Sequence, residues 1–109
     1  MDFDERIKTI ANMPQNDYED LLVRIIAKHH KEGFNEVLFN LRDKNRLSLM
    51  RFIVSLNAKF KESGKVVPLL KISATTIDSV GGFHLTDGEN VIDCSLETLI
   101  NNGEELLPV

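Results

Sequence analysis

The sequence has little cysteine and lacks long apolar runs, and these shortages exclude several classes of protein. Cys94 is the single cysteine among 109 residues, so the chain can form neither an internal disulfide bond nor a metal site built from several cysteines. No stretch reaches the roughly 18 consecutive apolar residues that a membrane-spanning helix needs. The acidic N-terminus also differs from the basic start of a secretory signal. We therefore expect a protein of a reducing, cytoplasmic compartment that does not insert directly into a membrane.

Strong positive charge and tryptophan are lacking as well. The chain has 13 basic and 17 acidic side chains, a net charge of -4, one tyrosine and no tryptophan. Nucleic-acid binding relies on a positive surface and on aromatic stacking, so this composition argues against a nucleic-acid partner. Residues 34–64 carry a net positive charge, with six basic and three acidic side chains, whereas the segments before and after them are net negative. They could face an acidic partner or form a solvated face.

Hydrophobic residues make up 42% of the chain, which is enough for the core of one domain. The first dozen residues predict a short helix in which Phe3, Ile7 and Ile10 form a narrow apolar seam. Pro14 ends this helix because the residue before a proline avoids the helical conformation. So narrow a seam cannot hold a short helix alone in water. We expect the helix either to pack on the domain or to continue a longer upstream helix.

Two further helices are predicted, and their apolar faces differ in width. From a cap at Asn16 or Asp17 to a stop at Gly33, apolar residues keep helical spacing on one side. A third helix, from a cap at Asp43 to Gly64, is apolar over an arc of about 240°. We expect this third helix to lie between a sheet and either another helix or a partner protein.

Strand patterns fill the rest of the chain. Residues 34–41 alternate in hydrophobicity, and residues 66–72 form a second apolar run in which Pro68 favours an edge strand. Residues 82–86 and 89–93 flank Asp87-Gly88, which predicts a hairpin with a tight turn.

Ser95 can cap a last helix, which Asn102-Gly103 interrupts. The elements then follow the order α-α-β-α-β-β-β-α. This order predicts an α+β fold, in which a small, mostly antiparallel four-stranded sheet packs with helices.

Candidate catalytic residues are few. His29 and His30 are neighbours on a helix and diverge by about 100°, so they cannot bind one ion together, and we expect packing or capping roles. His84 is expected to lie on the outer side of the sheet. Cys94 follows Asp93, whose charge raises a thiol pKa. We predict no catalytic, cofactor-binding or metal-binding residues, and no cofactor.

The glycine pair and the acidic residues near the hairpin do not change this interpretation. Gly81-Gly82 lacks the spacing of phosphate-binding loops and precedes a strand instead of a helix. Backbone freedom at the start of a strand, or the close approach of another chain, explains the pair better. Asp87, Asp93 and Glu97 carry oxygen ligands but have no EF-hand spacing.

Several segments resemble, in order, one known family. Residues 12–22 combine the end of a short helix, a proline and a Y-x-x-L-L helix, and residues 36–41 read E-V-L-F-N-L. Residues 81–99 combine a glycine-glycine strand, a hairpin and the helix start S-L-E-T-L. Over roughly residues 5–100, the chain resembles the C-terminal globular domain of the E subunit of the V-type and archaeal-type (A/V) rotary ATPases.

The resemblance implies a non-catalytic peripheral-stalk (stator) subunit of a proton- or sodium-transporting ATPase or ATP synthase. In that family, a long N-terminal helix pairs with the helix of a second stalk subunit, and the C-terminal domain is seated on the catalytic head. Residues 1–15 would be the end of the stalk helix, and residues 16–109 the globular domain. The implied partners are the second, helical stalk subunit and the head subunits. The implied location is cytoplasmic, at the membrane through the complex.

Two departures from the family pattern stand out. The long charged stalk helix is absent, which suggests a truncated chain that starts at Met1. Residues 103–109 are shorter and more broken than the closing helix common in the family.

Partner contact is expected at two places, the N-terminal seam and the third helix. The candidate residues are Phe3, Ile7 and Ile10 in the seam, and Arg46, Leu47, Arg51 and Val54 on the helix. Ordinary packing inside the domain is the alternative for each. Two alternative functions also remain open: a stand-alone α+β domain that binds or regulates proteins, and a small enzyme that uses His84 or Cys94.

Overall fold

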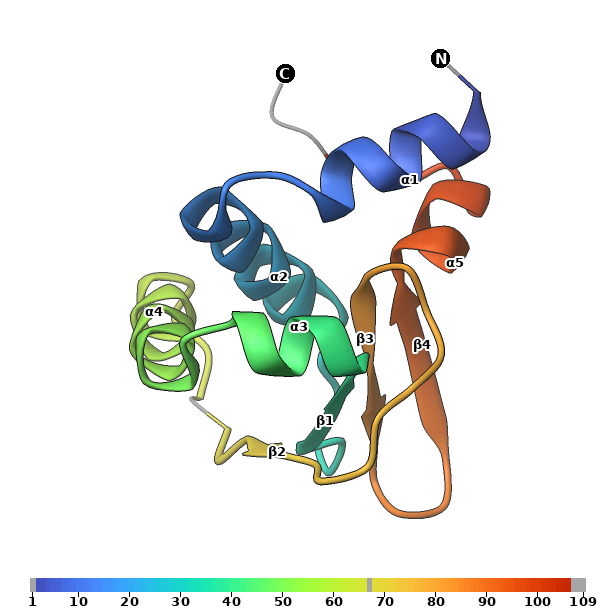
Figure 1. Cartoon of the computed structure of the whole chain (residues 1–109). Coiled ribbons are helices and arrows are strands. Elements are labelled where there is room, and N and C mark those ends of the chain that lie inside the picture. The colour runs from blue at the N-terminus through green and yellow to red at the C-terminus, as the bar shows by residue number, and fades with distance from the viewer. Residues whose placement is uncertain (1, 67, 107–109) are drawn as a thin grey trace.

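Residues 2–66 and 68–106, which the structure describes, form five helices and one four-stranded sheet in the computed structural model (Figure 1). The α+β class is confirmed. The elements in chain order are α1 (Phe3–Ala11), α2 (Gln15–His29), β1 (Glu36–Phe39), α3 (Leu41–Arg46), α4 (Leu49–Glu62), β2 (Lys71–Ile72), β3 (Gly82–Thr86), β4 (Val91–Ser95) and α5 (Leu96–Asn101).

The sheet has the strand order β2-β1-β3-β4 and is mixed. β3 pairs antiparallel with both β1 and β4, whereas β2 runs parallel to β1. β2 is an edge strand, as Pro68 predicted, but it is shorter than expected. Pro68 lacks a backbone N–H, so the ladder forms only after it, at Lys71–Ile72. Residue 67 of the predicted strand lies outside the described residues.

The predicted hairpin is confirmed, with its turn displaced by one residue. Thr86 pairs with Val91, and the Asp87 N–H donates to the Asn90 carbonyl over 3.3 Å, so Gly88 and Glu89 occupy the central positions. Gly88 has φ +101°, and no residue type other than glycine adopts positive φ in the described part of the chain. A type I′ turn needs two residues with positive φ, so the turn at Gly88-Glu89 is not of that type.

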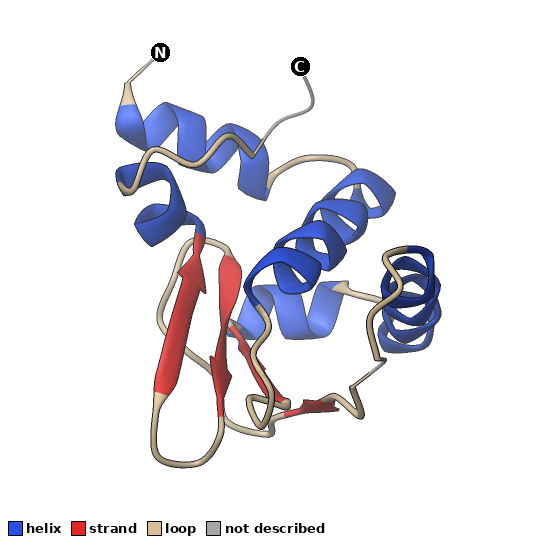
Figure 2. Cartoon of the chain, turned by 180° about the vertical axis from the view of Figure 1, so that it is seen from behind, coloured by secondary structure: helices blue, strands red, loops and turns tan. Residues whose placement is uncertain are grey.

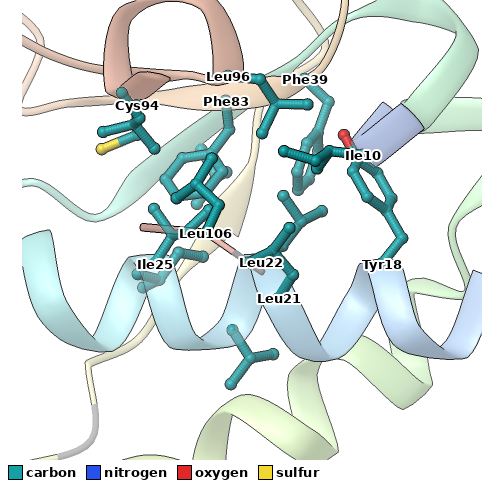
Figure 3. Packing of buried hydrophobic residues seen from close by; sticks show 14 of the residues in the cluster. Ile10, Tyr18, Leu21, Leu22, Ile25, Phe39, Phe83, Cys94, Leu96 and Leu106 are labelled. Carbon is teal, nitrogen blue, oxygen red and sulfur yellow. The ribbon is translucent and has the colours of Figure 1, made fainter. Parts of the chain in front are cut away.

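The core lies between α2 and one face of the sheet. In Figure 3, Tyr18 and Leu22 point from α2 towards Phe83 and Leu96, and all four side chains are fully buried. The Phe39 ring meets the Phe83 ring edge-to-face, with 6.2 Å between centroids. The apolar face of α2 predicted from its periodicity is therefore confirmed. α2 begins at Gln15 after Pro14, without a side-chain cap, so the expected caps at Asn16 or Asp17 were wrong.

The single third helix predicted from Asp43 to Gly64 is wrong, because two caps divide this segment into α3 and α4. The Asn40 side chain accepts from the Asp43 N–H (2.7 Å) and caps α3. The chain is extended at Leu47, and Ser48 then caps α4 through the Arg51 N–H (3.4 Å). Both residue types compete well for backbone N–H groups, so each starts its own helix.

α4 packs on α2, and its Phe52 ring lies 5.7 Å from the Phe39 ring of β1. Both views place α4 on the opposite side of the molecule from β4 (Figures 1 and 2). α1 packs along α5, at the end of the sheet far from the hairpin turn (Figure 1). Ser95 caps α5 by accepting from the Thr98 N–H, and the helix ends before Asn102-Gly103, as predicted.

Candidate interaction surfaces

The N-terminal seam is packed inside the chain. Ile7 and Ile10 are each only 2% exposed, because α1 turns back at Pro14 and lies against α5. Of the three seam residues, only Phe3 is accessible, at 43%. Packing on the domain, the alternative interpretation of the seam, therefore describes Ile7 and Ile10 in this structure.

Arg46 and Leu47 also make most of their contacts inside the domain. The Arg46 guanidinium donates to the carbonyl oxygens of Ala11 (2.7 Å) and Met13, where α1 ends. It lies 4.9 Å from the centre of the Tyr18 ring, a cation–π geometry. Leu47 is 6% exposed. Arg46 thus joins α3 to the connection between α1 and α2.

Tyr18 is the centre of a buried hydrogen-bond network that the sequence did not reveal. Its hydroxyl donates to Asp43 Oδ2 (2.5 Å) and accepts from the Gly82 N–H (2.9 Å). Burial raises the pKa of Asp43, against the opposing effects of the Tyr18 hydrogen bond and the nearby arginines. Burial also raises the pKa of Tyr18 far above its ordinary value. One hydroxyl therefore connects α2, α3 and β3, three segments far apart in the sequence.

α2 carries a second buried carboxylate, on the residue that follows Tyr18. Glu19 is 1% exposed and accepts from the Ser48 N–H (3.1 Å) and from Gln15 Nε2 (3.0 Å). The Arg51 Nε atom lies 3.7 Å from Glu19 Oε1, and another nitrogen of its guanidinium donates to Asn16 Oδ1. Arg51, predicted as a contact residue, therefore combines a structural ion pair with a partly exposed side chain.

The outer side of α4 is the largest accessible apolar feature among the predicted contact regions. Met50 is 81% exposed and Val54 is 63% exposed, and Ala58 and Lys61 continue their row at helical spacing. Beside this row, α4 and residues 68–70 enclose a groove of about 280 Å³, with Ile53, Leu56 and Leu70 among its lining residues. We call Met50, Val54, Ala58, Lys61 and this groove the α4 outer surface.

The curated proteins that this chain resembles include several E subunits of V-type complexes. The E subunit of the V-type proton ATPase of Clostridium botulinum strain Loch Maree is 34% identical over 100 residues, which cover 92% of this chain. The E subunit of the V-type ATP synthase of strain Langeland is 35% identical over the same length. The E subunit of the V-type ATP synthase of Acetivibrio thermocellus is 29% identical over 96 residues, 88% of this chain.

This chain is a homologue of the E subunit of V-type ATPases. The resemblance found in its motifs is confirmed. The chain spans about half the length of these relatives, 49% of both Clostridium proteins and 48% of the Acetivibrio protein. No protein-family model matches the chain, and no solved structure matches it significantly.

In this E-subunit homologue, several residues of the motifs that carried the resemblance lie in the core. Tyr18, Leu21 and Leu22 of the Y-x-x-L-L segment are all buried. Gly82 has φ +80°, and a Cβ built there would meet the Leu96 nitrogen at 2.8 Å and the Cys94 carbonyl oxygen. A side chain on Gly81 would meet Leu96 and the Tyr18 hydroxyl. Backbone freedom at the start of the strand is therefore confirmed for Gly82, and the segments that approach the pair, α2, β4 and α5, belong to the same chain.

The titratable residues considered for chemistry have structural partners in this E-subunit homologue. His29 Nε2 lies 2.9 Å from both Glu104 carboxylate oxygens, and Lys28 Nζ lies 2.6 Å from one of them. Partial burial opposes the ionisation of Glu104, but these two hydrogen bonds prevail and lower its pKa. His84 is half-buried on the sheet, 3.2 Å from an Asp93 oxygen.

Cys94 is fully buried, and burial raises the pKa of its thiol to about 12, with Asp93 and Glu104 adding to the effect. A thiol of this pKa is a poor nucleophile at neutral pH. Within residues 2–66 and 68–106, no three His, Cys, Asp or Glu side chains are placed to share a metal ion. The described helices include none that is long and apolar enough to cross a lipid bilayer.

Proposed function

We propose that this E-subunit homologue is a non-catalytic peripheral-stalk domain that anchors the stalk of a V-type or A-type ATPase to the catalytic head. The observation that supports this most is the similarity to E subunits of V-type ATPases over 92% of the chain. The complex would transport protons or sodium ions, driven by ATP or driving its synthesis. This domain would work through contact and stiffness, without catalysing a reaction or binding a cofactor.

The internal contacts suit a part that bears load. A stator must pass torque from the stalk to the head without deforming. Arg46 holds the end of α1 against α3, and the Tyr18 hydroxyl holds α2 against α3 and β3. In this proposal, residues 1–15 are the end of the stalk helix and residues 16–109 are the globular domain. Force on α1 would reach the sheet through α5 and Arg46.

The proposed partners are the second, helical stalk subunit and the head subunits. The domain would lie on the cytoplasmic side and be held at the membrane through the complex. Of the residues predicted for contact, Phe3, Arg51 and Val54 keep accessible side chains. Phe3 lies on α1, and Arg51 and Val54 lie on α4, so two separate contacts are available to two different partners.

The test uses the purified V-type ATPase of cells that encode the chain, with and without its gene. We expect the protein to copurify with the complex, and its loss to lower ATP-driven ion transport while the head still hydrolyses ATP. A complex that lacks the protein in wild-type cells would contradict the proposal. A complex that assembles and couples normally after deletion would favour the alternative, a stand-alone binding or regulatory domain.

A further inference from the structure

We infer that the α4 outer surface is a docking site for an amphipathic helix of a partner protein, with acidic side chains beside its apolar face. The inference rests on the proposed function, since it names the chemistry of one partner of the proposed stator domain. Three observations support it: the exposed apolar row, the groove beside it, and the distribution of charge around both.

The apolar row has the shape of a helix-packing surface. Met50, Val54 and Ala58 recur every fourth residue, which makes one ridge along α4. From Met50 to Lys61 the ridge is about 16 Å long, which matches about three turns of a partner helix. Ala58 is small enough to let a second helix approach closely. Residues Leu49 and Ile53 widen the apolar strip towards the groove.

The groove supplies a place for an anchor residue. About 280 Å³ between α4 and residues 68–70 accepts one or two large apolar side chains, and Leu69 at its border is 92% exposed. Helices that bind in grooves insert apolar residues at spacings of three and four. A short extended peptide fits less well, since β2 offers an edge of only two residues after Pro68.

Charge identifies the partner as acidic. Residues 41–71 contain eight of the 13 basic side chains and only two of the 17 acidic ones. Of those two, Asp43 is fully buried and Glu62 is the last residue of α4. Arg46 bonds to backbone carbonyls inside the domain and Arg51 pairs with Glu19, so the remaining six basic side chains supply the positive charge. Lys61 lies in the exposed row, and Lys65 and Lys71 border residues 66–70. A cationic patch on a chain of net charge -4 complements an acidic surface.

The same charges argue against the other occupants. A second copy of the chain would place Lys61, and Lys65 and Lys71 at the border of this surface, against the same residues of the other copy, where like charges repel. Helices that lie on membranes combine a strongly cationic face with aromatic anchors. The exposed row of α4, within the described residues, has no aromatic residue and carries Lys61 alone, while the other cations lie along its border. A protein helix therefore fits the surface better than lipid.

The experiment places a photo-crosslinking amino acid at Val54 in the full chain within the purified V-type ATPase, and identifies the linked peptide by mass spectrometry. The same amino acid at Val91 of β4, which is 58% exposed against 63% for Val54, is the matched control. We expect Val54 to link to a helical segment of another subunit in which acidic residues flank an apolar face. Linkage to lipid, to a second copy or to a basic segment would overturn the inference.

Point variants measure how much this surface contributes to incorporation into the complex. Val54→Asp should lower incorporation into the complex about tenfold, because a charge enters an apolar contact, whereas Val91→Asp should leave it within about twofold. Lys61→Glu should lower incorporation about threefold, and Lys31→Glu, also exposed, should not.

If the wild-type chain incorporates but Val54→Asp and Lys61→Glu incorporate equally well, the inference fails while the proposed function stands. If the wild-type chain is absent from the complex, the proposed function fails.

Discussion

Arg46 and Val54 lie on the same predicted helix, and the structure gives them opposite surroundings. Arg46 donates to two backbone carbonyls and covers the Tyr18 ring, so it holds segments of the chain together. Val54, on α4, is 63% exposed to solvent. The difference arises at Leu47-Ser48, where the chain ends one helix and starts another. The Tyr18 network therefore lies inside the fold, whereas Met50 and Val54 of the α4 outer surface are exposed.

The largest expected effect concerns Gly82, whose N–H donates to Tyr18. Gly82→Ala should lower the free energy of unfolding by about 4 kcal/mol, since the residue has positive φ and its Cβ would strike the backbone of β4 and α5. Gly88→Ala is the matched control: its φ is +101° but nothing lies within 4 Å, so about 1 kcal/mol should be lost. Urea titration followed by circular dichroism measures both. Equal losses would show that the crowding at Gly82 is unimportant.

The next effect concerns the Tyr18 hydroxyl itself. Tyr18→Phe keeps the ring beneath Arg46 but leaves the buried Asp43 carboxyl and the Gly82 N–H without this partner. It should cost about 3 kcal/mol in the free energy of unfolding, measured by the same urea titration. Asp43→Ala combined with Tyr18→Phe should cost less than the two single changes added together, because the two groups bind each other. Strict additivity would mean that the hydrogen bond adds nothing to the fold.

An intermediate effect is expected at Glu104, which links the C-terminal segment to α2 at the surface. Glu104→Gln should cost about 1 kcal/mol at pH 7. The fold lowers the pKa of Glu104 from its ordinary value of 4.5, so its carboxylate stabilises the protein above pH 4.5. That contribution disappears as the pH falls through the lowered pKa. Thermal unfolding of both proteins between pH 7 and pH 3 should show the difference shrinking, and a constant difference would rule out ionisation as its cause.

The smallest effect on stability is expected at Met50. Met50→Asp changes an 81% exposed residue in the first turn of α4, where a negative charge suits the helix dipole. The free energy of unfolding should change by less than about 0.5 kcal/mol in a urea titration. A loss above about 1.5 kcal/mol would show that this part of α4 is packed inside the domain, and the distinction between the two regions would fail.

Periodicity and turn residues predicted most of the fold. The α2 face, the hairpin, the Ser95 cap and the edge position of β2 all follow from local patterns, which depend on neighbours in the sequence. The division of the third helix was missed because the apolar spacing continues across Leu47, while the caps at Asn40 and Ser48 decide where each helix begins. Asn40 and Ser48 were visible as capping residue types, so this signal was available.

The burial of Ile7 and Ile10 could not be predicted from the sequence, for a physical reason. Spacing shows that Ile7 and Ile10 share a face, but not which element covers it, and α5 is 85 or more residues away in the chain. The Tyr18–Asp43–Gly82 network joins residues 18, 43 and 82, and no local pattern indicates such a contact. Val54 and the apolar breadth of α4 were anticipated because a helix apolar over so wide an arc cannot bury all of its sides.

The most direct test of the account is hydrogen–deuterium exchange of the chain alone and within the purified V-type ATPase. If the α4 outer surface docks a partner while the Tyr18 network only maintains the fold, peptides from residues 49–62 should gain protection in the complex. Peptides around Tyr18 and Asp43 should exchange slowly, and equally, in both states. Unchanged exchange across residues 49–62, with protection gained only over β3 and β4, would contradict the account.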